Sequence, residues 1–351
     1  MPGGIDGGKW MRAFQWLGHS CFWALLLVIF LIAGCGVPAA PKNAGTDNGD
    51  GGYTVTDAKG TEVRIPHKPQ RILSLAIYTD EILLGVVPPE RMVAISRYLD
   101  DPKESNVVAE AQKIPIKVTN PTAEQILGWQ PDLVIANDWT TPEMVSAIRD
   151  MGIPVVVCGP GNSYADIQGS IRLVAASVDE AAHGQQVIDR MDAVLQDIEA
   201  KVAQIPENQR KKVVLLSIMT NYGGAGSAFD AMCRHAGVTN GIAAGGIKNG
   251  QTLTKEMLVK INPDILLLPN YDDHGTYDSQ AFIRDYLEDP SLQTITAIRD
   301  QACYYPRESY VYNASQDFVF GVQEIAYCAY GEAFRQEDNR HISFAEAEEG
   351  R

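Results

Sequence analysis

The hydrophobic pattern of this chain repeats one unit in two distant places. The two segments are TAEQILGWQPDLVIA, residues 122–136, and TKEMLVKINPDILLL, residues 254–268. Each begins with a Thr that can cap a helix, continues through an apolar helical turn to Pro-Asp, and ends in four apolar residues. Proline ends the helix, and a short apolar run is typical of a strand buried on both faces of a parallel sheet. The pattern therefore predicts two α/β halves.

Further elements are predicted in front of the first unit. A β-hairpin is expected around the turn Asp57–Gly60. The run RILSLAIY, residues 71–78, predicts a buried strand, and Thr79 is the expected cap of the helix that follows. A second strand, RMVAIS, leads into a polar loop and then into the repeat unit.

A long helical segment is predicted between the halves. Its cap is Asn162 or Ser163, and apolar residues recur with a helical period to about Ala203. Gly184 marks the place where this stretch can divide into two helices. We therefore expect an α/β fold with two Rossmann-like lobes, mostly parallel sheets and a long α-helical connector.

Changes in composition set the expected domain boundaries. They are 1–34, a lipoprotein signal peptide; 35–52, a lipid-anchored flexible tether; 53–163, an N-terminal α/β lobe; 164–205, the connecting helix; 206–334, a C-terminal α/β lobe; and 335–351, a polar and frayed tail. The tether is rich in Gly, Pro, Ala, Asn and Asp and shows no periodicity.

The N-terminus is typical of an export signal. Two basic residues precede an apolar run that ends in Ala33-Gly34-Cys35. A permanent membrane anchor is the alternative, since residues 14–34 are about the 20 residues needed to span a bilayer. The small residues before Cys35 resemble a bacterial lipobox, which implies cleavage there and a lipid on the Cys35 sulfur. The body is then expected at the extracytoplasmic face of a bacterial membrane, whether Met1 or Met11 is the true start.

Composition excludes some functions and leaves the cysteines open. The 351 residues carry a formal net charge of -15, which argues against nucleic acid, because that binding depends on Lys and Arg. The body's cysteines have neither CxxC nor Cys/His ligand spacing, so buried thiols and one disulfide both remain open. They are Cys158, Cys233, Cys303 and Cys328.

Aromatic residues recur where a ligand would bind. In open α/β sheets, ligands bind beyond the carboxyl ends of the strands. Tyr78, Tyr98 and Trp139 follow strands of the first half, and Tyr222 and Tyr271 hold matching places in the second. If they converge on a cleft, they provide flat surfaces for a large ligand; the alternative is that they cap the core.

Signals for catalysis are weak. Gly224 and Gly226 open a helix after a strand, which suits a dinucleotide or an anionic group, but Phe229 stands where the third glycine of a dinucleotide motif belongs. Asp272-Asp273-His274 is better explained as a solvated turn than as a metal site. No nucleophile elbow, HExxH or Walker sequence occurs. We therefore expect no catalytic residue, no metal site and no cofactor.

Each repeat unit carries a Glu two residues after its Thr. A structural explanation for Glu124 and Glu256 is that an acid in the first helical turn is favoured by about 0.3–1 kcal/mol. The alternative is that two exposed acids, one in each half, anchor a two-fold partner.

These features together resemble a known family. The lipobox, the hairpin, RILSL, the Glu-to-Pro-Asp units and the joining helix are similar to the ferric-siderophore and cobalamin class of periplasmic binding proteins of ABC importers, from Tyr53 to about Phe334. The resemblance implies a monomeric lipoprotein that captures a metal chelate, such as a ferric siderophore, haem or a cobalamin-like corrinoid. It delivers that ligand to a permease dimer with ATPase subunits. The resemblance also implies that Glu124 and Glu256 dock into arginine-lined pockets of the permease.

The resemblance further implies how the ligand is held. The five aromatic residues named above would hold the chelate between the lobes, with Tyr98 facing a corrin and Arg97 available for an anionic edge. Because the connector is helical, we expect only a small closure on binding. A membrane-tethered nucleotide-dependent enzyme and a ligand-sensing receptor on the same scaffold are the alternatives.

Overall fold

The computed structural model describes residues 46–47, 51–270, 277–337 and 339–345, which belong to one compact unit over residues 43–351. Its strands are β1 Thr46–Asp47, β2 Tyr53–Thr56, β3 Glu62–Ile65, β4 Ile72–Ser74, β5 Met92–Ser96, β6 Lys117–Val118, β7 Leu133–Ala136, β8 Val155–Val157, β9 Lys212–Leu215, β10 Thr239–Asn240, β11 Ile265–Leu267 and β12 Cys303–Tyr304. Its α-helices are α2 Ile77–Val86, α3 Val108–Ala111, α4 Ala123–Gly128, α5 Pro142–Asp150, α6 Tyr164–Ser177, α7 Ala181–Val202, α8 Ala228–His235, α9 Gly241–Ala244, α10 Lys255–Ile261, α11 Ser279–Leu287, α12 Thr296–Arg299, α13 Glu308–Val311 and α14 Phe318–Tyr330. Short 3-10 helices are η1 Pro89–Arg91, η2 Arg97–Asp100, η3 Glu207–Gln209, η4 Pro290–Leu292 and η5 Glu332–Phe334.

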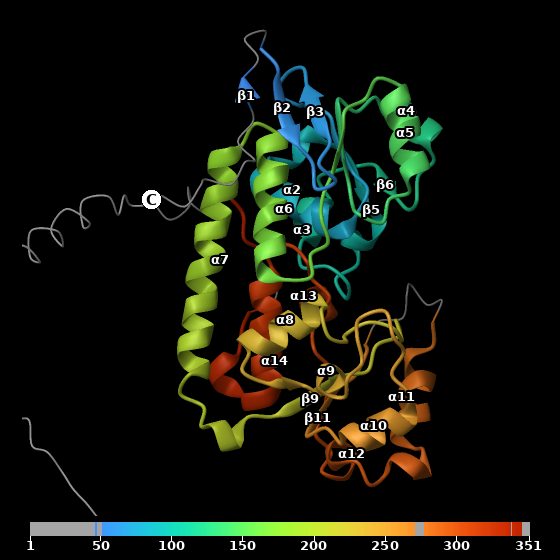
Figure 1. The fold of residues 1–351 in the computed structure, drawn as a ribbon, viewed down its shortest axis with the longest axis vertical. Coiled ribbons are helices and arrows are strands. Elements are labelled where there is room, and N and C mark those ends of the chain that lie inside the picture. Colours follow the sequence, from blue (N-terminus) through green and yellow to red (C-terminus); the bar gives the residue numbers. More distant parts are fainter. Residues whose placement is uncertain (1–45, 48–50, 271–276, 338, 346–351) are drawn as a thin grey trace, which may run out of the picture. The chain divides into compact units, whose positions relative to one another are not determined.

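Two parallel sheets form the centres of two lobes (Figure 1). The first has the strand order β6-β5-β4-β7-β8 and the second has the order β10-β9-β11-β12. In both, the strand of the repeat unit, β7 or β11, pairs with the first strand of the lobe, β4 or β9. The antiparallel strands β1, β2 and β3 make a separate small sheet. The predicted α/β fold with two mostly parallel lobes is confirmed.

The strands of the repeat units are buried on both faces. Leu133 and Ile135 of β7 belong to a central apolar cluster that contains residues of both lobes, whereas Val134 belongs to an outer cluster of the first lobe. Ile265 and Leu267 of β11 belong to the same central cluster. Successive side chains of a strand point to opposite faces, so an unbroken apolar run serves two cores. The central cluster therefore holds the two lobes together.

The repeat helices α4 and α10 begin and end alike. The hydroxyl groups of Thr122 and Thr254 each accept a hydrogen bond from the amide three residues on, at 3.3 Å in both helices. Gln130 and Asn262, the residues before each proline, both have left-handed backbone conformations, with φ of 52° and 46°. The two predicted threonine caps are confirmed, and the helix ends match as well.

The Pro-Asp pair fastens each repeat unit to its sheet. The carboxylate of Asp132 accepts hydrogen bonds from the backbone amides of Gln70 and Arg71, at 2.8 and 2.9 Å, just before β4. Asp264 accepts one from the amide of Lys212 in β9, at 2.8 Å. The aspartate therefore sets where the first strand of each lobe lies relative to the repeat helix.

The connector consists of two helices rather than one. Ser163 caps α6, as predicted, through a 3.2 Å hydrogen bond from the amide of Asp166. The break between α6 and α7 falls at residues 178–180, where Asp179 has a φ of 57°, and not at Gly184. Gly184 lies inside α7. Glycine is needed there because a Cβ at this position would clash with Ala175 of the neighbouring helix α6. With 22 residues, α7 is about 33 Å long and runs along one side of both lobes (Figure 1).

The strand expected over residues 71–78 is shorter than predicted. β4 ends at Ser74, and α2 begins at Ile77 with Ala76 as its cap. Thr79 is therefore not the helix cap but a buried residue of α2, where its hydroxyl lies 2.6 Å from that of Ser74. The error has a physical origin. The apolar run LAIY, residues 75–78, continues directly from β4, and a short apolar run does not distinguish a strand from the start of a buried helix.

Residues 339–345 are packed against the body, in contrast to the frayed tail expected over 335–351. His341 and Ile342 are buried, and the Ile342 amide donates to the Asp317 carboxylate at 2.9 Å. The Phe344 ring stacks on His183 with 4.3 Å between ring centroids. A tail with only a few apolar residues can pack against the body when the body provides hydrogen-bond partners for its backbone groups.

The N-terminal predictions fall mostly outside the described residues, including the predicted signal segment 1–34 and the predicted lipid attachment at Cys35. Residues 46–47, expected in the flexible tether, form β1 and pair with β2, so this part of the tether extends the hairpin sheet. Among the residues that the structure describes, no helix is both long enough and apolar enough to cross a membrane.

The four cysteines of the body are free thiols, which decides between the two possibilities left open by the sequence. Cys158, Cys233 and Cys328 are buried, and Cys303 is half-buried. Burial raises the pKa of the Cys158 and Cys328 thiols to about 12. These two side chains therefore stay protonated and behave as small apolar residues.

Candidate ligand-binding site

A cavity of about 510 Å³ lies between residues of the first and second lobes. It is lined by residues 74–78, 80–81, 96, 98–99, 104, 118–121 and 139 of the first lobe, and by residues 218–219, 308–309 and 312–314 of the second. The first-lobe segments are the ends of β4, β5 and β6, the start of α2 and the turn after β7. This is the edge of a parallel sheet at which ligands bind. Its volume is in the range of small-molecule sites.

Three of the predicted aromatic residues line this cavity. The rings of Tyr78 and Trp139 lie 5.7 Å apart at 53°, and the Tyr78 hydroxyl donates to the carbonyl of Gly159 at 3.0 Å. Trp139 sits in a tight turn, and 66% of its surface is exposed. Tyr98 completes the set on the short helix after β5. A large exposed aromatic beside a cavity is available for a ligand at no cost to the core.

The other predicted ligand residues lie elsewhere. The guanidinium of Arg97 is exposed and lies 5.6 Å from the Tyr98 ring centroid, outside the cavity wall. Tyr222 turns into the second lobe, where its ring lies 5.0 Å from that of Tyr312, which does line the cavity. Tyr271 is outside the described residues. The second lobe thus reaches the cavity through Met219 and Tyr312. Tyr312 belongs to the aromatic residues that recur later in the sequence, but it was not among the predicted ligand contacts.

Carboxyl groups make up much of the polar lining. Asp80 and Glu81 lie side by side on α2, Glu308 begins α13, and Glu104 lies between η2 and α3. One oxygen of Asp80 accepts from the amide of Ser96 at 3.0 Å. The sequence contained a signal for the first pair, because two adjacent acids in an otherwise apolar helix cannot both reach solvent.

Burial shifts the protonation of this pair. Burial and then the nearby Asp317 carboxylate raise the pKa of Glu81 to about 8, against the opposing effect of hydrogen bonds from neighbours. Burial also raises the pKa of Asp80 well above its ordinary value, against the opposing effect of the Ser96 amide. Both groups therefore hold a proton more tightly than an exposed carboxyl does.

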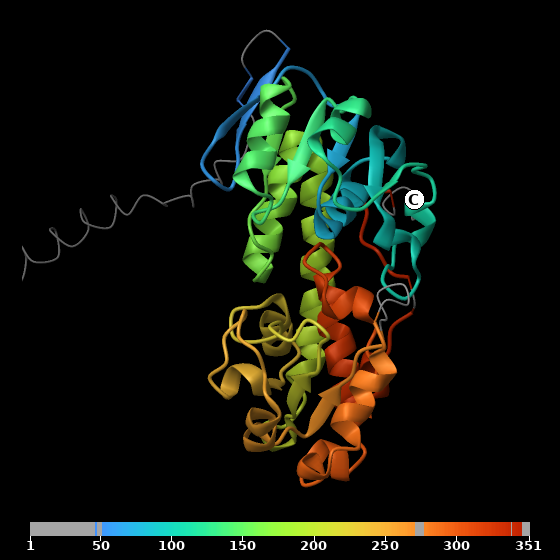
Figure 2. The same ribbon diagram turned by 90° about the vertical axis from the view of Figure 1, so that its right-hand side faces the viewer.

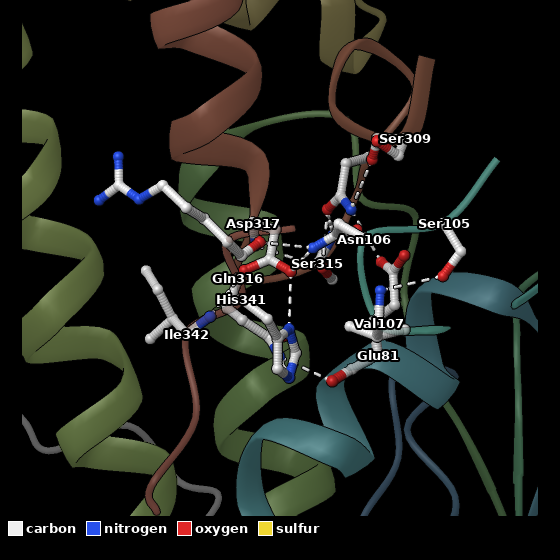
Figure 3. Close-up of polar contacts among 12 residues, drawn as sticks. Glu81, Ser105, Asn106, Val107, Ser309, Ser315, Gln316, Asp317, His341 and Ile342 are labelled. Atoms are coloured by element: carbon white, nitrogen blue, oxygen red, sulfur yellow. Dashed lines mark hydrogen bonds and ion pairs between the residues drawn. The ribbon is translucent and has the colours of Figure 1, made fainter. Parts of the chain in front are cut away.

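Behind the cavity, a buried polar cluster joins the two lobes (Figure 3). The Asn313 side chain donates to Glu81 at 2.9 Å, and the Asn106 side chain donates to Asp317 at 2.7 Å. Asp317 also lies 2.7 Å from the imidazole of His341. Burial alone would lower the pKa of His341, but the Asp317 carboxylate raises it to about 9. The cluster adds a second, polar connection to the one made by α7.

The glycine loop before α8 is built for a different purpose. Ser227 caps the helix by accepting from the Asp230 amide at 3.0 Å, and Asp230 accepts from the amide of Gly226 at 3.2 Å. The Asn240 side chain donates to both Asp230 and the carbonyl of Gly223. The Asp230 carboxylate already accepts hydrogen bonds from the Gly226 amide and the Asn240 side chain. The loop is therefore a poor site for the phosphates of a dinucleotide.

The two glutamates of the repeat units are exposed. Glu124 and Glu256 lie in the first turns of α4 and α10. In each, the pKa is lowered by the residue's own backbone amide and then by the preceding Thr hydroxyl, so both are ionised at neutral pH. Both helices lie on the side of the unit opposite α7 (Figure 1), and Figure 2 looks onto this face.

Comparison with known proteins agrees with this geometry. A family profile described as "Periplasmic binding protein" matches residues 72–310. The chain is 24% identical over 323 residues to an uncharacterised ABC transporter substrate-binding lipoprotein, YvrC, of Bacillus subtilis, covering 89% of this chain and 97% of that one.

Solved structures share the fold at low sequence identity. The molybdate-binding protein MolA of Haemophilus influenzae superposes with a TM-score of 0.66 at 20% identity, covering 79% of this chain and 91% of that one. The haem-binding protein RhuT of Roseiflexus superposes with a TM-score of 0.64 at 22% identity, covering 76% and 99%. The family profile spans most of both lobes and the connector, and it rules out the nucleotide-dependent enzyme considered above. This chain therefore belongs to the periplasmic binding protein family, whose members bind solutes and do not catalyse reactions.

Proposed function

We propose that this protein is the substrate-binding lipoprotein of an ABC importer. It captures a metal chelate, such as a ferric siderophore, haem or a cobalamin-like corrinoid, between its lobes. The observation that carries the proposal is the cavity of about 510 Å³ beside an exposed Trp139, with a Tyr78 ring 5.7 Å away. Flat rigid rings give large contact area to a planar or bulky chelate at low entropic cost.

The proposed contacts follow from the cavity wall. Tyr78, Tyr98 and Trp139 contact the ligand directly, and Arg97 lies at its margin beside Tyr98. Tyr222 supports the site from behind through Tyr312. Tyr271 remains a sequence-based expectation.

Delivery is proposed to use the face that carries α4 and α10. Glu124 and Glu256 are ionised, exposed and carried one on each lobe, which suits docking onto a two-fold permease dimer with arginine-lined pockets. A lipid on Cys35 would hold the body at the extracytoplasmic face of the membrane, in line with the lipoprotein relative. The binding protein itself acts as a monomer.

Titration of the purified chain tests the ligand class. Cyanocobalamin, haem and a neutral ferric trihydroxamate are added in turn, and absorption spectra and thermal unfolding are recorded. A ligand at 100 times its Kd should stabilise the protein by about 2.7 kcal/mol. Stabilisation by at least one chelate, and none by NAD or ATP, supports the proposal. Stabilisation by a nucleotide and by none of the chelates would contradict it.

A further inference from the structure

The charge of the cavity wall narrows the class of ligand, on the premise that the proposed function is correct. Four carboxyl-bearing residues line the cavity: Asp80, Glu81, Glu104 and Glu308. Among the described lining residues, none is Lys, Arg or His. The acids come from both lobes, so a bound molecule meets them from two sides.

Asp80 offers a specific place for a cation. The side chain is buried, with 1% of its surface exposed, and it lines the cavity. Its Oδ2 accepts from the Ser96 amide, whereas Oδ1 has no hydrogen-bond partner in the described part of the chain. A buried carboxyl in such a place holds its proton tightly, and a cation beside it would favour the charged form. Binding of a positive ligand and loss of the Asp80 proton are therefore coupled.

The charged groups behind the cavity wall do not neutralise the carboxyl groups that line the cavity. His341 is the titratable base near Glu81, and it is already paired with Asp317 at 2.7 Å. Glu81 takes its hydrogen bond from the neutral amide of Asn313. With a pKa of about 8, Glu81 is largely protonated at neutral pH, so the pair of His341 and Asp317 leaves no net positive charge behind the wall.

The aromatic residues favour the same kind of ligand. Tyr78, Tyr98, Trp139 and Tyr312 line the cavity together with the acids. The faces of such rings attract cations, most strongly where water is excluded. The formal charge of -15 on the whole chain adds a long-range attraction for positive ligands.

From these observations we infer that the cavity selects positively charged ligands, that is, a cationic metal chelate or a chelate with an ammonium group, and discriminates against anionic ones. An oxyanion such as molybdate, or a ligand that presents carboxylates to this wall, would meet acids instead of donors. This chain therefore takes a different ligand class from an oxyanion binder of the same fold, such as MolA.

The test uses three ferric trihydroxamates that differ only at one terminal amine. The amine is free and positive, acetylated and neutral, or succinylated and negative. Quenching of tryptophan fluorescence in the full-length chain, purified in detergent, gives each Kd. We expect the positive probe to bind at least tenfold more tightly than the neutral probe, and the negative probe at least tenfold more weakly.

Variants show which side chain causes the preference for the positive probe. Asp80→Asn keeps an acceptor for the Ser96 amide and should bring the Kd values of the positive and neutral probes within threefold of each other. Glu143→Gln, an exposed acid on α5 outside the cavity, serves as the matched control and should leave the tenfold preference unchanged. If Asp80→Asn does not fold, Glu308→Gln provides the same test from the other lobe.

Each outcome separates the inference from the proposed function. Equal binding of the three probes, or tightest binding of the negative one, overturns the inference and leaves the chelate-binding function standing. Tetraethylammonium is titrated alongside as a cation that carries no iron. Its binding, with no binding of any iron probe, would support the charge preference and contradict the proposed chelate ligand. Binding of no cationic probe at all overturns the inference.

Discussion

The two lobes share a scaffold but divide the work at the cavity. β7 and β11 pair with the first strands of their lobes in the same way, and α4 and α10 have the same caps and the same exposed glutamate. The cavity is not shared equally. The first lobe supplies three aromatic residues and three acids, whereas the second supplies Tyr312, Met219 and Glu308. Duplication therefore explains the shared frame and the matching exposed glutamates, and divergence of the loops explains why the two lobes contribute unequally to the cavity wall.

A second difference concerns the approach to the repeat units. Residues 118–121 line the cavity and lead directly to Thr122, the cap of α4. In the second lobe, the residues before the cap Thr254 do not belong to this wall. Only the first of the two repeat helices is thus joined to the cavity by a few residues of chain.

The largest expected effect tests what the lobes have in common. Replacing both Glu124 and Glu256 by Ala should abolish uptake of the chelate into vesicles that contain the permease, because the two proposed charged contacts to the permease are lost. The Kd for the ligand should stay within twofold, since neither residue lines the cavity. Glu143→Ala is the control, and the two single variants show whether the lobes dock equally. Loss of ligand binding in the double variant would refute the assignment.

The next effect tests the unequal division of the cavity. Trp139 and Met219 are exposed by 66% and 50%, one on each lobe, so neither replacement should alter stability. Trp139→Ala should weaken ligand binding by about 2 kcal/mol, and Met219→Ala by about 1 kcal/mol or less, because large aromatic anchors dominate such contacts. Isothermal titration measures both, and a greater loss for Met219→Ala would reverse the comparison.

Stability measurements compare the two Pro-Asp anchors. Asp132 accepts two backbone hydrogen bonds and Asp264 accepts one from the strand that each fastens. Replacement by Ala should cost about 3 kcal/mol at Asp132 and about 1.5 kcal/mol at Asp264, as expected for bonds to charged groups. Urea unfolding gives both values, and Asp132→Asn, which keeps one carbonyl acceptor, should fall between. Equal costs would show that the second hydrogen bond contributes nothing.

The polar cluster between the lobes predicts a pH dependence. The pKa of Glu81 is raised from 4.5 to about 8 and that of His341 from 6.5 to about 9, so both groups bind protons more tightly in the folded state. Their stabilising contribution is complete below the unfolded pKa values and is lost as the pH rises through the folded ones. The free energy of unfolding should therefore decline between pH 5 and about 9.

Urea unfolding at several pH values measures this slope. Glu81→Gln can still accept from Asn313 and should flatten the decline, whereas Glu143→Gln should not. A slope that is unchanged in Glu81→Gln would assign the pH dependence to other groups.

The smallest expected effect is the closure of the lobes. α7 packs against helices of both lobes, the central apolar cluster is continuous, and the polar cluster adds a second link. Ligand binding should therefore leave the radius of gyration measured by X-ray scattering almost unchanged. A hinge rotation of tens of degrees would contradict this expectation.

Local chemistry was sufficient to predict much of the frame. The Thr caps, the Pro-Asp ends and the four apolar residues after them depend on neighbours within one turn, so the sequence of each unit determines them. Patterns that depend on surroundings were less informative. Thr79 was predicted as a cap because the apolar run that leads from β4 into α2 does not show where the helix begins. Gly184 was predicted as a break because the local sequence does not show that α7 packs closely against α6 at this residue.

The residues alone were enough to predict the duplication, the α/β character of each half and one exposed glutamate at the start of each repeat helix. Which aromatic residues meet could not be predicted in this way. Tyr78, Tyr98 and Trp139 line one cavity, whereas Tyr222 packs behind it. The tertiary structure also brought acids of α2 and α13 to the same cavity, although they are far apart in the sequence. Periodicity records which face of an element is apolar, but the distance between two loops is set by the packing of the lobes around α7.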